Sequence, residues 1–203
     1  MDTKSVMEVT TFSIKSDANS KTFAELDAKV ESGFTSKQPG FIVRQSGVDE
    51  KGNYVVVVYW NSLADADSSM SKFMKDTSVA GYAQMIEGST MKMSRYTVEK
   101  PFSAVGSQFV EIMTFDINKD TDLAKFNATN QKVETDFTGK RDGFLQRLTG
   151  VNEEGKQVVA VYWASKETSD ASLEPFMAAP IAKEFMADMN QSTMRMGRYE
   201  LLN

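Results

Sequence analysis

The sequence predicts an α+β protein that contains one module twice. The first observation is an internal repeat, in which residues 8–14 (EVTTFSI) match residues 111–117 (EIMTFDI) at an offset of about 103 positions. The second is the order of strand-like and helix-like hydrophobic patterns within each copy, which reads β-α-β-β-α-β. The third is that both faces of the Val-rich strand at 54–60 are apolar, so a helix layer on one face leaves the other face to be covered.

The repeat sets the boundaries of the two modules. The same offset aligns three further motifs without a gap, namely 39–41 with 142–144, 58–60 with 161–163, and 89–96 with 192–199. We therefore expect a first repeat at residues 1–99 and a second at 107–203, joined by a linker at 100–106. The simplest cover for the bare face of each sheet is the sheet of the other repeat, which predicts a pseudo-dimer packed sheet to sheet with the helices outside.

The first half of the module reads as strand, helix and strand. Residues 6–15 alternate as a strand does, and residues 17–20 supply turn and N-cap side chains. Gly40 ends the connection that follows, and residues 41–46 form the second strand. Between them, apolar residues recur at helical spacing, at Phe23, Leu26, Val30 and Phe34.

The second half reads as strand, broken helix and strand. Residues 49–53 contain a glycine and predict a hairpin loop into the strand that ends at Trp60. The next segment carries two apolar stripes at helical spacing, at 70–74 and at 79–86. Residues 90–98 close the module as a strand, and the complete order is that of the split βαβ, or ferredoxin-like, motif.

The composition narrows the chemistry that the chain can perform. It has no cysteine, which excludes disulfides, thiolate nucleophiles and cysteine zinc sites, and no histidine, which removes the imidazole ligand of many metal sites. The net charge is −5 and the basic residues are scattered, so we expect no nucleic-acid partner. Carboxylates cluster nowhere at metal-ligand spacing, and we expect neither a metal nor a cofactor.

The sequence also indicates where the protein works. Residues 1–8 lack the apolar stretch of a signal peptide, and the longest apolar run, 54–60, is too short to span a bilayer. We expect a cytoplasmic protein with no membrane partner, present as a monomeric pseudo-dimer or as a homodimer.

The pattern resembles the antibiotic biosynthesis monooxygenase (ABM) domain family of the dimeric α/β-barrel superfamily, as a tandem duplication. The resemblance depends on the element order and on two motifs that occur once per half: 39–41 and 142–144 at the entry to the second strand, and 59–62 and 162–165 before the broken helix. It covers nearly the whole chain. It implies two fused ferredoxin-like repeats that pack as a dimeric α/β-barrel-like pseudo-dimer.

The superfamily resembled here is broad, and fold alone does not decide activity. It includes monooxygenases, haem-degrading enzymes, haem peroxidases, chlorite dismutases and isomerases. Its haem-degrading branch implies an Asn, a Trp and a His at positions that here hold Thr10, Ser69 and Val79, and Met113, Ser172 and Ala182. Since all three are missing in both copies, we expect the chain not to be a haem-degrading enzyme.

Two classes of function remain from the sequence. If the chain is an enzyme, the resemblance implies a cofactor-independent monooxygenase acting on a small apolar or aromatic molecule. The alternative is a non-catalytic small-molecule-binding or structural protein of the same fold. No catalytic residue is assigned.

The candidate ligand-binding residues lie at matching places in the two copies. Glu8 and Glu111 fall on the helix-facing side of the first strand, where a buried carboxylate could act as a base or hold a polar group. The alternative for each is a structural ion pair, with Arg95 or Arg44 in the first copy and with Arg198 or Arg147 in the second. Trp60 and Trp163 could line a site for a flat ligand, or belong to the core.

Differences between the copies favour the first as the ligand-binding half. Thr10 and Tyr82 supply hydroxyl groups where the second copy has Met113 and Phe185. The methionines near the broken helices fit either an adaptable pocket or irregular packing. The expected ligand-binding residues are Glu8, Thr10, Trp60, Tyr82, Glu111 and Trp163.

Overall fold

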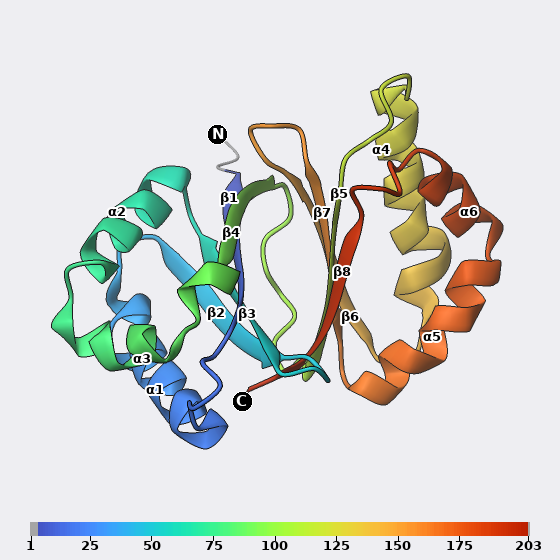
Figure 1. Cartoon of the computed structure of the whole chain (residues 1–203). Helices are drawn as coiled ribbons and strands as arrows, with labels where there is room; N and C mark the ends of the chain where they lie inside the picture. Colours follow the sequence, from blue (N-terminus) through green and yellow to red (C-terminus); the bar gives the residue numbers. More distant parts are fainter. Residues whose placement is uncertain (1–3, 203) are drawn as a thin grey trace. The chain divides into compact units, whose positions relative to one another are not determined.

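The computed structural model describes residues 4–202, and the α+β class is confirmed (Figure 1). The chain divides into two compact units, with the division between Phe102 and Ser103 and with Leu202 counted in the first. This division falls within the linker expected at 100–106. Residues 1–3 and 203, at the outer ends of the expected repeats, lie outside the described residues. Within residues 4–202, no helix has the length and apolar character needed to cross a membrane.

Unit 1 has the expected element order, with the second helical region split in two. Its elements are β1 (Ser5–Ser13), α1 (Ser20–Gly33), β2 (Phe41–Val48), β3 (Asn53–Trp60), α2 (Leu63–Phe73), α3 (Ala80–Met85) and β4 (Lys92–Val98). Helix α2 begins after Ser62, whose side chain accepts a hydrogen bond from the backbone N–H of Asp65. The last strand begins later than expected because Gly88–Thr90 forms a 3-10 turn, in which the Thr90 hydroxyl accepts the N–H of Ser13.

Unit 2 follows the same order. Its elements are β5 (Phe109–Phe115), α4 (Leu123–Lys132), β6 (Phe144–Val151), β7 (Gln157–Trp163), α5 (Lys166–Ala178), α6 (Pro180–Ala187) and β8 (Arg195–Leu201). Proline at the first position of α6 marks the break in the helical region, as the missing N–H of proline costs nothing there.

Each unit has one antiparallel sheet with its helices on one face (Figure 1). In unit 1, β1 pairs with β3 on one side and with β4 on the other, and β2 pairs with the far side of β3. In unit 2, β5 pairs in the same way with β7 and β8, and β6 with β7. The register sets Glu8 opposite Arg95 and Glu111 opposite Arg198, so the first strand of each unit carries a glutamate beside an arginine.

An aromatic core joins sheet and helices in each unit. In unit 1 the ring of Phe23, on α1, lies 4.6 Å from that of Tyr54 and 5.0 Å from that of Tyr82. In unit 2 the matching rings of Phe126 and Phe185 stack at 5.6 Å. These rings set the distance between the helix layer and the sheet of each unit. The buried polar groups of the unit lie beside them.

Candidate functional site

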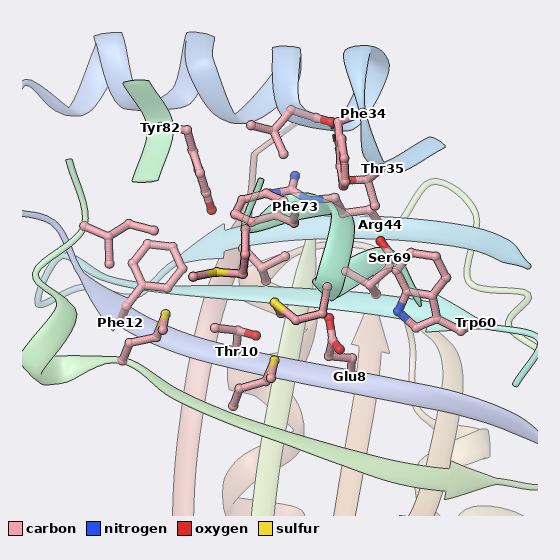
Figure 2. A pocket seen from close by; sticks show the side chains of 18 residues that line it. Glu8, Thr10, Phe12, Phe34, Thr35, Arg44, Trp60, Ser69, Phe73 and Tyr82 are labelled. Atoms are coloured by element: carbon pink, nitrogen blue, oxygen red, sulfur yellow. Dashed lines mark hydrogen bonds between the residues drawn. The ribbon is translucent and has the colours of Figure 1, made fainter. Parts of the chain in front are cut away.

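A cavity of about 190 Å³ lies between the sheet and the helices of unit 1 (Figure 2). Strands β1 to β4 contribute one side, and the helical segments the other. Most of the wall is aromatic, aliphatic or methionine side chain. The residues that line it are Glu8, Thr10, Phe12, Val30, Phe34, Thr35, Arg44, Val56, Val58, Trp60, Ser69, Met70, Phe73, Met74, Tyr82, Ile86, Met91 and Met93.

The four candidates named in the first copy all line this cavity. Glu8 and Thr10 face it from alternate positions on β1, as the period of two in a strand requires. Trp60 reaches it from the end of β3 and Tyr82 from α3. Figure 2 shows Glu8 and Thr10 on one wall, and Tyr82 across the cavity from them. That they bind a ligand stays a prediction, as it does for Glu111 and Trp163, which lie in unit 2.

Glu8 is a buried carboxylate with one ion-pair partner on the sheet. Its Oε2 accepts a hydrogen bond from Arg95 Nε at 2.5 Å, and Arg95 also pairs with Asp67 on α2. Burial raises the pKa of Glu8, and the hydrogen bond and charge of Arg95 oppose this rise. Among residues 4–202, Glu8 Oε1 has no hydrogen-bond partner. The ion pair weighed as an alternative is therefore present, and it leaves one oxygen of the cavity-lining carboxylate free.

A second buried ion pair flanks the cavity, and the sequence did not point to it. Arg44 donates from Nη1 and Nη2 to the two carboxylate oxygens of Asp27 at 2.9 and 2.5 Å, and both residues are buried. Burial, followed by the charge of Asp27, raises the pKa of Tyr82, so its hydroxyl stays protonated at neutral pH. The sequence feature that could have predicted this pair is the position of Asp27, which lies four residues after Phe23 and therefore on the apolar stripe of α1.

Unit 2 keeps this framework with different polar groups. Asn130 takes the place of Asp27, and Arg147 donates to its side-chain and backbone oxygens at 2.6 and 3.0 Å. Burial lowers the pKa of Arg147 to about 10. Phe185 takes the place of Tyr82, and the Arg147 guanidinium lies 5.4 Å from its ring centre. The second unit therefore buries the arginine without the bidentate carboxylate partner that unit 1 provides.

The two tryptophans behave alike. The indole Nε1 of Trp60 and that of Trp163 are both buried, and neither has a hydrogen-bond partner among residues 4–202. Each indole also packs against a phenylalanine at the start of the second strand, with ring centres 6.0 Å apart. Since both units share this arrangement, it belongs to the common framework and does not distinguish a site in unit 1.

Within residues 4–202, no set of three or more acidic side chains is placed to hold a metal ion.

The whole fold resembles that of solved structures. No family model matches the chain, and no curated protein matches its sequence. A "putative monooxygenase" from Fusobacterium nucleatum has a TM-score of 0.74 at 13% identity, covering 100% of this chain and 94% of that one. An anthrone oxidase-like protein has a TM-score of 0.67 at 10% identity, covering 98% and 92%. Chlorite dismutase from Candidatus Nitrospira defluvii has a TM-score of 0.66 at 11% identity, covering 100% and 93%.

One expectation from the sequence is wrong. The missing Asn, Trp and His argued against a haem-degrading enzyme and left a cofactor-independent monooxygenase as the enzyme class. The chain shares its fold with chlorite dismutases, which belong with haem-binding proteins, and with proteins described as monooxygenases. The fold therefore does not exclude a haem-related enzyme. The absence of histidine does not decide the matter, because haem iron also accepts Met and Tyr as axial ligands.

The Asp27–Arg44 pair yields a prediction about stability. Asp27→Asn, which imports Asn130, should lower the free energy of unfolding by about 3–5 kcal/mol, because it leaves a buried guanidinium without its carboxylate. Asn130→Asp, the matched change in unit 2, should raise it by about 1 kcal/mol, because it gives Arg147 a charged acceptor. Urea denaturation measures both. Equal losses in the two variants would contradict this account of the pairs.

Glu8 yields a prediction about pH. Its pKa is raised in the folded protein above the ordinary value of 4.5, so folded Glu8 keeps its proton at a pH where the unfolded chain has lost it. The stability that Glu8 contributes is therefore present below pH 4.5 and is lost as the pH rises through the folded pKa. Relative to Glu8→Gln, the wild-type protein should lose stability with rising pH in this window. Chemical denaturation at a series of pH values measures the difference, and a flat or rising difference would refute the assignment.

Proposed function

We propose that unit 1 binds a small apolar or aromatic molecule in its cavity. The observation that carries this proposal is an apolar space with a few polar groups on opposite walls, which is the usual make-up of a small-molecule site. An apolar cavity of about 150 Å³ is known to take up benzene. At about 190 Å³, this cavity has room for a body of one or two rings.

The lining also suits a ligand of that kind. Met70, Met74, Met91 and Met93 border the cavity, and the unbranched, polarizable methionine side chain adapts to ligands of irregular shape. Thr10 and Tyr82 add hydroxyl groups on opposite walls, and that of Tyr82 already interacts with Asp27 and Arg44. In unit 2 these two places hold Met113 and Phe185, which supports unit 1 as the ligand-binding half.

We further propose that the protein is a monooxygenase-like member of its fold class, built as a tandem pair of ABM-like, ferredoxin-like modules that pack sheet to sheet. The matching element order of the two units and their matching Glu–Arg pairs support the duplication. The likeness to an anthrone oxidase-like protein and to proteins described as monooxygenases supports oxygenase chemistry on an aromatic substrate. A non-catalytic binding protein is the alternative.

Binding can be tested with a small panel of probes. Naphthalene and 2-naphthol should raise the Tm of the wild-type protein, because a ligand that binds only the folded state stabilises it. Thr10→Met, which imports the larger side chain of unit 2, should weaken naphthalene binding about tenfold or more by filling the cavity, a loss of about 1.4 kcal/mol. Calorimetry measures the affinity of each variant.

The matched control is Met113→Thr, which changes the same position in unit 2 and should leave naphthalene affinity unchanged. Haemin is titrated in parallel, and oxygen uptake is followed with each probe that binds. No binding by naphthalene or 2-naphthol would overturn the proposed site, and a loss confined to Met113→Thr would assign it to unit 2. Binding without oxygen uptake across a broad panel of phenols would favour the non-catalytic alternative.

A further inference from the structure

Four methionine side chains line the unit 1 cavity, and three of them are exposed to solvent. Met70 is partly buried, whereas Met74, Met91 and Met93 are 76%, 53% and 41% exposed. Side chains that line a cavity and also reach solvent lie at its mouth. Methionine is usually buried, where it fills irregular gaps in a core. Because exposed side chains contribute little to packing, packing alone does not explain these three.

The four methionines form two pairs, one from a helix and one from a strand. The backbone N–H of Met74 donates to the backbone oxygen of Met70 at 3.1 Å, so these side chains lie one turn apart at the end of α2. Met91 and Met93 are two residues apart at the start of β4, and this spacing directs both to one face of the sheet. Met93 pairs in register with Thr10 of β1, which lines the same cavity. Figure 2 shows sulfur atoms (yellow) on side chains that enter the cavity from the helix side and from the strand side.

The chemistry of thioether sulfur decides which ion this group suits. A thioether is an uncharged, soft ligand and favours soft ions such as Cu(I), whereas Mg, Ca and Mn prefer oxygen ligands. Among the described residues that line the cavity, only Glu8 carries a carboxylate, and it is already paired with Arg95. The expectation of no metal site rests on carboxylates and does not cover thioethers.

Unit 2 has only part of this set. At the repeat offset, Met177, Met194 and Met196 match three of the four methionines, but Leu173 stands where unit 1 has Met70. Met194 packs against the hydrophobic core of unit 2. The pair of thioethers on the helix is therefore confined to unit 1, and the matching positions of unit 2 supply control variants.

We propose that unit 1 binds one Cu(I) ion at the mouth of its cavity, through the thioether sulfurs of Met70, Met74, Met91 and Met93. The methionine side chain is unbranched and has three rotatable bonds, so these sulfur atoms can close on an ion without a change in the backbone. This inference goes beyond the proposed function and does not depend on it, because the metal ion alone is the ligand.

Silver ion is the first probe, because Ag(I) is soft and monovalent like Cu(I) and is stable in air. Calorimetry in chloride-free buffer should show one Ag(I) bound per chain and no binding of Zn(II). In protein labelled at the methionine methyl carbons, the NMR signals of these four methyl groups should shift on binding. Each signal is assigned by its loss when that methionine is replaced by leucine. Titration with Cu(I) in the absence of oxygen, against bicinchoninate as a competitor, should give the same stoichiometry.

Two variants test the ligands. Met70→Leu, which imports Leu173, and Met74→Leu should each weaken Ag(I) binding about tenfold or more, since even the loss of a residue that only supports a metal ligand costs that much. Leucine has a similar volume and keeps the wall apolar, so both variants should fold, and thermal unfolding checks this. The matched control is Met177→Leu, which makes the same change as Met74→Leu in unit 2 and should leave the affinity unchanged.

The proposal is overturned if the wild-type protein binds neither Ag(I) nor Cu(I), or if it binds Zn(II) as tightly as Ag(I). It is also overturned if Met177→Leu loses as much affinity as Met74→Leu, or if folded Met70→Leu and Met74→Leu both bind as the wild-type protein does. If either variant fails to fold, the methyl signals of the wild-type protein decide: shifts confined to the four methionines support the site, and shifts only at other methionines overturn it.

Discussion

Charge buried between sheet and helices is the constraint on which the rest of each unit depends. Both units place an arginine on the second strand and a glutamate on the first, in the layer where the aromatic rings also pack. Removing such groups from water costs several kcal/mol each unless partners compensate. Arg44 receives a bidentate carboxylate and Glu8 a guanidinium, and these pairs determine which side chains the nearby helices must present.

The two units bury the same charged groups, an arginine and a glutamate, but the side chains that pair with those groups differ between the units. Arg147 has an amide in place of a carboxylate, and Glu111 has gained a serine hydroxyl. In unit 1, Thr10 and Tyr82 line the cavity at the positions where unit 2 has Met113 and Phe185. A few substitutions of this kind change the polar groups around a shared framework.

Much of this arrangement could be predicted from the sequence. The offset between the copies identified the repeated element order, and strand periodicity placed Glu8 and Thr10 on one face. Asp27 was missed because an acidic residue on a helix is usually solvated, and only the buried Arg44 beneath it reveals its role. The expectation about haem was wrong because the residues of one branch say nothing about other proteins that share the fold.

The most direct test of this account is the crystal structure of the protein with 6-bromo-2-naphthol, in which the anomalous scattering of bromine locates the ligand without ambiguity. The account predicts a bromine position within the cavity of unit 1. A bromine position outside that cavity would contradict the account.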